Sequence, residues 1–221
     1  MTYAGPQRMP VPSDRRSRKR LATREAISDV ATRLFAERGF DQVTVDEIAA
    51  AADVGRKTVF NHFPRKEDMF FDRIEEFGNL LRDALQERGS YGSSIEALRQ
   101  FAHRLVADQS YYVNFSAVSR DWIETMVQSE TLQARARAIR DETGRTLSRA
   151  LAQAAGQASA DAAATLAASL LMATWTAAFV EARRSFTEHG EAAQAQATFL
   201  EVIDQGTVGI QAALGRTSPE E

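Results

Sequence analysis

The 221-residue chain contains no cysteine and only three histidines, His62, His103 and His189, which are far apart in the sequence. Without cysteine it can form neither a disulfide framework nor a thiolate metal site. None of the histidines has a second histidine or a glutamate at zinc-site spacing. The longest apolar stretch, Ala162 to Val180, is rich in alanine and threonine, and we interpret it as a buried helix. The N-terminus has no apolar signal-peptide core, so we expect a cytoplasmic protein without a membrane partner.

Proline is also scarce, and three of the five prolines fall within residues 1–17. That segment has no helical periodicity and is predicted to be a disordered arm. Residues 1–24 hold seven Lys/Arg against one acid, Asp14. Residues 1–68 carry 13 Lys/Arg and 10 Asp/Glu, whereas residues 69–221 carry 14 and 20. A basic end joined to an acidic body fits a protein that touches nucleic acid with one end only.

Strand signals are absent, and apolar residues recur at helical spacing along the chain. The sequence therefore predicts an all-α fold of about nine helices. The expected helices span roughly residues 17–38, 45–52, 56–62, 66–87, 94–107, 111–127, 130–154, 160–187 and 191–213.

The segment Thr44–Asp68, TVDEIAAAADVGRKTVFNHFPRKED, predicts two short helices joined by a tight turn. Thr44 and Glu47 have the spacing of a capping box, and Asp53 tolerates the backbone geometry of a turn. Pro64 ends the second helix and favours the start of the next. The inner face of the second helix is expected to hold Val59, Phe60 and Phe63. Two short helices joined in this way form a helix-turn-helix, whose second helix enters the major groove of DNA.

Seven polar side chains of this segment have the chemistry for DNA contact. Arg and Lys can donate to guanine, Asn can pair with adenine, and Thr can offer a methyl to thymine or a hydroxyl to phosphate. Helix N-termini with a nearby hydroxyl or ammonium bind phosphate. The alternative is that these residues form the solvated face of a small helix. The predicted DNA-binding residues are Thr44, Arg56, Lys57, Thr58, Asn61, His62 and Lys66.

Twenty residues of this region also match a known family pattern. They are Ala26, Ala31, Leu34, Phe35, Gly39, Phe40, Thr44, Val45, Ile48, Ala49, Ala52, Val54, Thr58, Val59, Phe60, His62, Phe63, Lys66, Glu67 and Asp68. With them, residues 21–70 resemble the N-terminal domain of the TetR family of transcriptional regulators. The run TVFNHFPRKED is the most specific part, since it matches the family's stretch around a Tyr-x-x-Phe-x-x-Lys core.

The resemblance implies that three segments of the chain have different roles. Residues 1–17 would be the basic arm, residues 18–66 a three-helix helix-turn-helix DNA-binding domain, and residues 67–215 a helical ligand-binding and dimerisation domain. The implied function is a homodimeric repressor, released from its double-stranded DNA operator by a small lipophilic or amphipathic effector. No cofactor is implied.

Three residues depart from the family pattern in the DNA-binding segment. Asp53 stands where the turn usually has Gly, Gly55 replaces a Ser or Thr cap, and Phe60 replaces a Tyr. Each lost hydroxyl contact is worth on the order of 1 kcal/mol. Arg56 and Lys57 can offset these losses, because each phosphate that a cation neutralises strengthens binding at low salt.

The C-terminal part of the chain holds a group of aromatic and methionine side chains. These residues could line a tunnel in which a lipophilic ligand separates helices, and the polar tips of Tyr and Trp could orient that ligand. The alternative is an ordinary core. The residues predicted for the pocket are Phe101, Tyr111, Tyr112, Phe115, Trp122, Met126, Met172, Trp175 and Phe179.

The last two helices alternate small and large apolar residues along one face, which is typical of a helix–helix interface. Two helices from each subunit would form a four-helix dimer interface, as in the family. A twofold dimer would space its recognition helices by roughly 34–36 Å or a multiple, matching successive major grooves. The predicted interface residues are Leu170, Ala177, Phe199, Val202, Ile203 and Ile210.

Other classes of protein fit the sequence less well. An enzyme would need a reactive constellation, but the carboxylate pairs Glu75–Glu76 and Asp141–Glu142 are adjacent and point to different sides of a helix. A glycine-rich phosphate loop is also missing. Two alternatives remain. A ligand-independent DNA-binding protein would have a filled core in its second domain in place of a pocket. An activator differs from a repressor in the position of its operator, which the protein sequence does not specify.

Overall fold

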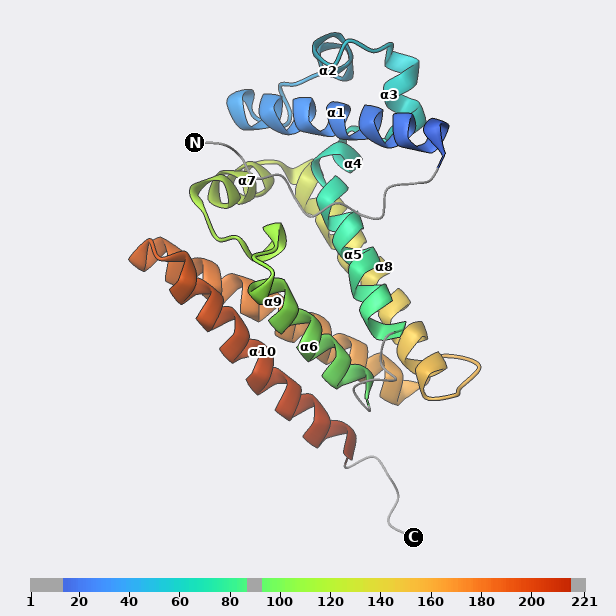
Figure 1. Ribbon diagram of the computed structural model, residues 1–221, viewed down its shortest axis with the longest axis vertical. Helices are drawn as coiled ribbons and strands as arrows, with labels where there is room; N and C mark the ends of the chain where they lie inside the picture. Colours follow the sequence, from blue (N-terminus) through green and yellow to red (C-terminus); the bar gives the residue numbers. More distant parts are fainter. Residues whose placement is uncertain (1–13, 87–92, 216–221) are drawn as a thin grey trace. The chain divides into compact units, whose positions relative to one another are not determined.

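The computed structural model describes residues 14–86 and 93–215, and within them all regular structure is helical (Figure 1). The predicted all-α fold is confirmed. The helices are α1 (Arg15–Arg38), α2 (Val45–Ala51), α3 (Arg56–His62), α4 (Lys66–Phe70), α5 (Asp72–Gln86), α6 (Ser94–Ala107), α7 (Ala117–Gln128), α8 (Glu130–Ala154), α9 (Ala162–His189) and α10 (Ala192–Gly215), with a short 3-10 helix at Tyr111–Val113. The expected bounds of α6 and α8 agree with the structure.

The described residues form ten α-helices instead of the expected nine, because the helix predicted over residues 66–87 is broken. The break lies at Phe71, whose backbone angles (φ −97°, ψ 11°) end α4 before α5 begins. Phe70 and Phe71 are both buried, and their rings meet edge to face with centroids 5.1 Å apart. The break therefore accompanies the burial of two consecutive aromatic side chains, a tertiary effect that helical periodicity does not encode.

The first helix begins earlier than the sequence predicts. Asp14 is its N-cap, and one carboxylate oxygen of Asp14 accepts a hydrogen bond from the Arg16 amide at 2.6 Å. A carboxylate at this position stabilises a helix N-terminus. The basic residues from Arg15 onward therefore lie on α1, whereas residues 1–13 of the predicted arm fall outside the described residues.

The chain divides into two compact units. The N-terminal unit comprises residues up to 76 together with residues 121–136, and the C-terminal unit comprises residues 77–120 and 137 onward. The boundary expected at residue 66 thus differs from the division in the structure. The second segment joins the N-terminal unit because Trp122 stacks on Phe70, with ring centroids 4.7 Å apart.

The core of the N-terminal unit gathers the apolar face of α1 and the inner sides of the three short helices. Helix α1 contacts α2 and α4, and α2 contacts α3 (Figure 1). The completely buried side chains are large and aliphatic or aromatic, so the short helices are held by packing instead of by intrinsic stability. These side chains are Ile27, Phe35, Val43, Ile48, Val59, Phe63, Met69 and Phe71.

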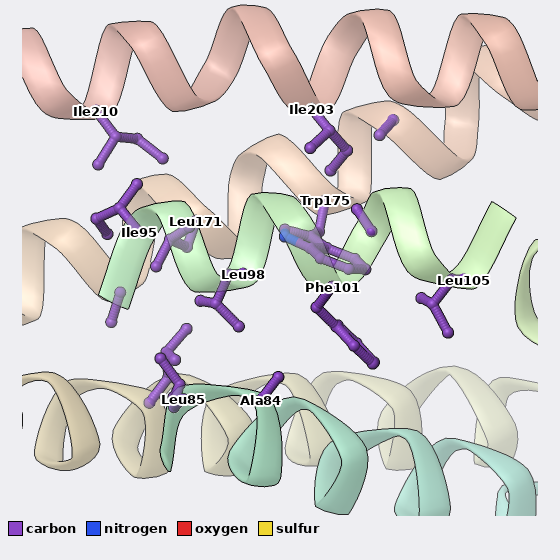
Figure 2. Packing of buried hydrophobic residues seen from close by; sticks show 14 of the residues in the cluster. Ala84, Leu85, Ile95, Leu98, Phe101, Leu105, Leu171, Trp175, Ile203 and Ile210 are labelled. Atoms are coloured by element: carbon purple, nitrogen blue, oxygen red, sulfur yellow. The ribbon is translucent and has the colours of Figure 1, made fainter. Parts of the chain in front are cut away.

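The core of the C-terminal unit is built around α6 (Figure 2). Leu98 and Phe101 of α6 lie among side chains from α9 and α10, including Trp175 and Ile203. Ala84 and Leu85 of α5 close another side of the same cluster (Figure 2). One contiguous apolar cluster therefore unites α5, α6, α9 and α10.

Helix α9 is long and apolar enough, by length and composition, to cross a membrane. Core helices of soluble proteins pass the same test. Small buried residues of α9, such as Ala168, Ala178 and Ala182, belong to the apolar cluster of the C-terminal unit. The close approach of α9 and α10 is clearest at Gly206, where a Cβ atom would lie 2.2 Å from Cγ2 of Thr174.

We expect Gly206→Ala to destabilise the protein by about 1–3 kcal/mol, because the added methyl overlaps the branched side chain of Thr174. Gly209→Ala is the matched control in the same helix, since nothing lies within 4 Å of its Cβ position. That change should stabilise α10 by about 0.5–1 kcal/mol. Urea denaturation of the two variants would measure both effects. Equal stability of the two variants would contradict the close approach of α9 and α10.

Candidate nucleic-acid interface

Thr44 begins α2 through the predicted capping box. Its hydroxyl accepts a hydrogen bond from the Glu47 amide at 3.2 Å, and the Glu47 carboxylate accepts from the Thr44 amide at 2.8 Å. The Thr44 amide, the Thr44 hydroxyl and the nearby Arg38 lower the pKa of Glu47 to about 2. Thr44 is exposed, but its hydroxyl also donates to the Glu47 carboxylate at 2.8 Å, so a phosphate would have to replace Glu47 as the acceptor.

The turn between α2 and α3 uses the geometry expected from the sequence. Asp53 has a positive φ of 52°, which Asp tolerates better than most residues. The amide of Val54 then donates to the carbonyl of Ala49 at 3.0 Å. Gly55 caps α3 without a side-chain hydrogen bond, as expected from the missing hydroxyl. The turn therefore keeps its shape without the family's usual Gly and Ser or Thr.

Helix α3 buries one side and exposes the other. Val59 and Phe63 are completely buried, whereas Arg56, Lys57 and Asn61 are exposed. Thr58 is half-buried. The structure thus separates an anchoring side of α3 from a polar side that is open to solvent.

Phe60 does not point inward, contrary to the sequence-based expectation. Its side chain is 40% exposed, and the guanidinium carbon of Arg56 lies 5.5 Å from its ring centroid. Helical residues one turn apart share a face, so Phe60 follows Arg56 onto the open side. The solvent-exposed face of α3 therefore combines two cations, an amide and an aromatic ring.

Arg56 is paired within the protein, but the pair is weak. Its guanidinium lies 2.7 Å from a carboxylate oxygen of Asp46 on α2, and both side chains are largely exposed. Exposed ion pairs typically contribute only about 0.2–1 kcal/mol. A base edge or phosphate could therefore replace Asp46 at little cost.

Lys66 has a different environment from the one predicted. Its ammonium donates to the carbonyls of Phe40 and Val43 at 2.8 and 2.9 Å and lies 4.0 Å from the Phe40 ring centroid. Burial lowers the pKa of Lys66, although Asp41 and Glu67 partly offset this effect. The geometry favours a role in holding the connection between α1 and α2 over direct contact with phosphate.

His62 ends α3 in a half-buried position. Burial lowers the pKa of its imidazole, and the positive charges of Arg20 and Arg24 lower it further. The backbone carbonyl of His62 accepts a hydrogen bond from Arg24 at 2.6 Å, which ties the end of α3 to α1. A neutral imidazole at this position could act as either donor or acceptor.

The predicted pocket residues are divided between the two units. Trp122 and Met126 belong to the N-terminal unit, and Trp122 packs against both Phe70 and Phe71. The other predicted pocket residues belong to the C-terminal unit. They are Phe101, Tyr111, Tyr112, Phe115, Met172, Trp175 and Phe179. The sequence grouped α7 with the aromatic residues before it, because spacing along a chain does not reveal which core a helix joins.

Within the C-terminal unit most of these aromatic residues pack directly on one another. Trp175 lies 6.0 Å from Phe101 and 6.3 Å from Phe179, measured between ring centroids. Phe77 and Phe199, which the pocket prediction missed, are 5.6 and 5.8 Å from Trp175. The helical register of Phe199 could have indicated its place in the core, because Phe199 shares a face with Ile203. We refer to these five rings as the aromatic cluster.

Three of the six predicted dimer residues are wrong. Phe199, Ile203 and Ile210 are at most 2% exposed and pack inside their own chain. Figure 2 shows Ile203 and Ile210 directed toward α6. Leu170 and Val202 are half-buried, and Ala177 is exposed. Periodicity identified the apolar face of α10 correctly, but that face meets α6 and α9 of the same chain.

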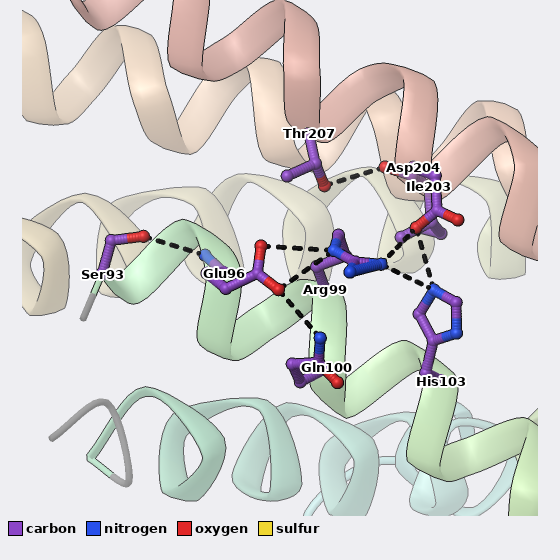
Figure 3. Close-up of polar contacts among 8 residues, drawn as sticks. All are labelled: Ser93, Glu96, Arg99, Gln100, His103, Ile203, Asp204 and Thr207. Atoms are coloured by element: carbon purple, nitrogen blue, oxygen red, sulfur yellow. Dashed lines mark hydrogen bonds and ion pairs between the residues drawn. The ribbon is translucent and has the colours of Figure 1, made fainter. Parts of the chain in front are cut away.

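A polar network joins α6 to α10 beside this core (Figure 3). One carboxylate oxygen of Asp204 lies 2.9 Å from Arg99 and 2.8 Å from Nε2 of His103. Glu96 holds Arg99 from the opposite side at 3.1 Å. Within the described residues, no group of three or more His, Asp or Glu side chains is arranged to hold a metal ion.

The comparison with protein families supports the DNA-binding interpretation of the N-terminal unit. Residues 27–72 match the family of bacterial regulatory proteins, tetR family. These residues are a tetR-family domain. The match covers α2, α3 and α4 together with the second half of α1, so it includes the whole helix-turn-helix.

Curated relatives match part of the chain. The chain is 28% identical over 85 residues to the icaADBC biofilm operon negative regulator IcaR of Staphylococcus epidermidis, covering 38% of this chain and 46% of IcaR. It is 31% identical over 83 residues to the regulator TcmR of Streptomyces glaucescens, covering 38% of this chain and 37% of TcmR. The alignments thus span less than half of these relatives' length. Both relatives are transcriptional regulators, not enzymes.

Solved structures resemble the chain over most of its length. SmeT in complex with triclosan has a TM-score of 0.54 at 22% identity, covering 85% of this chain and 91% of SmeT. Salmonella enterica GusR has a TM-score of 0.55 at 20% identity, covering 88% and 96%. At this identity the likeness concerns the fold alone, and it extends the fold assignment to the tetR-like arrangement of helices beyond residue 72.

We expect Lys66→Met to destabilise the protein by about 1–3 kcal/mol, because it leaves the Phe40 and Val43 carbonyls without their donor. Methionine keeps the length and apolar character of the side chain. Lys57→Met is the matched control on the exposed side of α3 and should change stability by less than about 0.5 kcal/mol. Urea denaturation would compare the two. Similar stability of both variants would contradict the structural role of Lys66.

Proposed function

We propose that this protein is a DNA-binding transcriptional regulator, acting as a homodimeric repressor that a small lipophilic or amphipathic molecule releases from its operator. The observation that carries the proposal is the exposed cationic side of α3, anchored through Val59 and Phe63 in a tetR-family domain. That IcaR is a negative transcriptional regulator supports repression as the default activity. An operator on chromosomal DNA is consistent with a cytoplasmic location.

Each predicted DNA contact has a separate role in this proposal. Arg56, Lys57 and Asn61 would contact base edges in the major groove, where Arg and Lys recognise guanine and Asn recognises adenine. Thr44 would bind a backbone phosphate at the start of α2, with the phosphate replacing the Glu47 carboxylate as the acceptor of its hydroxyl. Thr58 and His62 would contact the DNA backbone at the two ends of the exposed face.

The aromatic cluster is the proposed effector site. A lipophilic molecule could replace ring–ring contacts around Trp175, with Tyr112 supplying a polar tip near Phe77, whose ring centroid is 5.0 Å away. SmeT, whose fold is similar, was solved as a complex with triclosan, which supports a small-molecule effector. Such a ligand lowers DNA affinity only to the extent that it prefers the DNA-free conformation.

The proposed dimer interface uses the solvent-exposed faces of α9 and α10. Val180 and Val208 are 57% and 66% exposed, which is unusual for valines in a packed protein. Leu166 and Ala177 extend the apolar face along α9 at helical spacing, and both are exposed. Burying this face against a second copy would remove apolar surface from water and place two copies of α3 on the operator.

The proposal is tested by fluorescence anisotropy with duplexes from the DNA that flanks the gene, against a scrambled duplex. We expect Arg56→Ala or Asn61→Ala to weaken binding to the specific duplex about 5- to 150-fold, because a bidentate base contact is worth about 1–3 kcal/mol. Binding to scrambled DNA should change much less. Arg33→Ala is the control, since Arg33 is an exposed arginine on α1. Equal effects of Arg33→Ala and Arg56→Ala would contradict the role of α3.

The dimer interface is tested separately by sedimentation velocity. We expect Val180→Glu and Val208→Glu to shift the protein from dimer to monomer, because each buries an unpaired carboxylate against the second copy. Val127→Glu changes another exposed valine, on α7, and should leave the dimer intact. If all three variants remain dimeric, the interface lies elsewhere on the molecule.

A further inference from the structure

The N-terminal unit contains a cavity of about 340 Å³ at the C-terminal end of α3. Its size is at the lower end of pockets that hold small molecules. The chain contributes to it from α1, α3, the start of α4 and the start of α8. The lining residues are Arg24, His62, Pro64, Arg65, Asp68 and Arg135. None of the aromatic cluster lines this cavity.

Two of the lining arginines are fixed in place by carboxylates. Arg24 contacts Asp72 through Nε at 3.0 Å and lies 4.2 Å over the ring of Phe63. Arg135 contacts the nearly buried Asp68 at 2.9 Å. The other oxygen of Asp68 accepts from the Arg65 amide at 3.1 Å, so both oxygens of this carboxylate are occupied. A bound anion would therefore face preorganised guanidinium groups and a carboxylate that is already neutralised.

The cavity has more positive than negative charge. The exposed Arg65 side chain lines it, and no ion pair or hydrogen bond of the Arg65 guanidinium is found within residues 14–86 and 93–215. Arg20 lies one turn before Arg24 on α1 and acts electrostatically on His62. Three arginines thus line the cavity, Arg24, Arg65 and Arg135. Against them stand Asp68, which also lines it, and Asp72, which pairs with Arg24, so an excess of about one positive charge remains at neutral pH.

We propose that this cavity binds a phosphate group, held by Arg65 and by the fixed guanidinium groups of Arg24 and Arg135. Arginine suits a phosphate because its planar guanidinium can donate two parallel hydrogen bonds to it. The neutral imidazole of His62 can supply a further donor. The phosphate comes either from a small phosphorylated molecule or from the backbone of bound DNA.

A phosphate bound in this cavity would affect the C-terminal end of α3. The carbonyl of His62 is already tied to Arg24, and its imidazole lines the cavity. A phosphate that bridges Arg24 and Arg65 would stiffen the C-terminal end of the recognition helix relative to α1. This consequence rests on the proposed function, whereas phosphate binding itself does not.

The experiment is a proton NMR titration of the three histidines in the full-length protein, without DNA, in inorganic phosphate or in chloride at equal ionic strength. We expect phosphate to raise the pKa of His62 by about 1, since an anion nearby favours the imidazolium. His103 and His189 lie outside the cavity and serve as internal references. No difference between phosphate and chloride at His62 would overturn the proposal.

A variant series separates a phosphate site from a general salt effect. Arg65→Gln should abolish the response of His62 to phosphate, and Arg65→Lys should retain part of it. Arg33→Gln removes an exposed arginine of α1 that does not line the cavity and should leave the response unchanged. Persistence of the full response in Arg65→Gln would overturn the assignment.

The source of the phosphate is decided by repeating the titration with a DNA duplex that the protein binds. If DNA raises the pKa of His62 and added phosphate then has no effect, the DNA backbone supplies the group. If added phosphate still raises the pKa in the complex and changes DNA affinity, a free phosphorylated molecule supplies it. Failure of DNA binding with a normal response to inorganic phosphate would reject the proposed function and keep the phosphate site.

Discussion

A seven-residue helix is not stable alone in water, so the recognition helix depends on the side chains that anchor it. Val59 and Phe63 are completely buried, and the carbonyl at the end of α3 is tied to Arg24 of α1. Because these contacts occupy one side and the end of the helix, its other side is left polar and open. The chemistry available for DNA contact is therefore a consequence of how α3 is packed.

The charged residues of the N-terminal unit have two kinds of role, and the residue type alone does not show which role a given residue has. Lys57 and Arg56 lie on the open side of α3, whereas Lys66 donates to two backbone carbonyls and Arg135 neutralises Asp68. Removing a cation of the second kind leaves buried polar groups unpaired, and stability falls before DNA contact is measured. A loss of DNA binding in a Lys66 variant would thus need a stability measurement before it could be assigned to the interface.

Much of the fold could be predicted from local patterns. Features that depend on neighbours in sequence are present in the structure as expected. They include the capping box of Thr44 and Glu47, the turn at Asp53 and the bounds of α6 and α8. The break at Phe71, the exposed Phe60 and the cavity beside α3 depend on neighbours in space. Periodicity shows that a helix has an apolar face, but it does not show whether α6 of the same chain or a second copy covers that face.

Under the proposed function, an effector acts through the aromatic cluster. Its rings are already in contact, and Asp204 of α10 holds Arg99 and His103 of α6 beside them. A molecule that enters must replace ring contacts with contacts of its own, so its binding energy depends on how far α6 separates from α9 and α10. Helices α5, α7 and α8 each contain residues of both units. Under the proposed function, a ligand that prefers the separated arrangement would therefore bias continuous helices that extend into the DNA-binding unit.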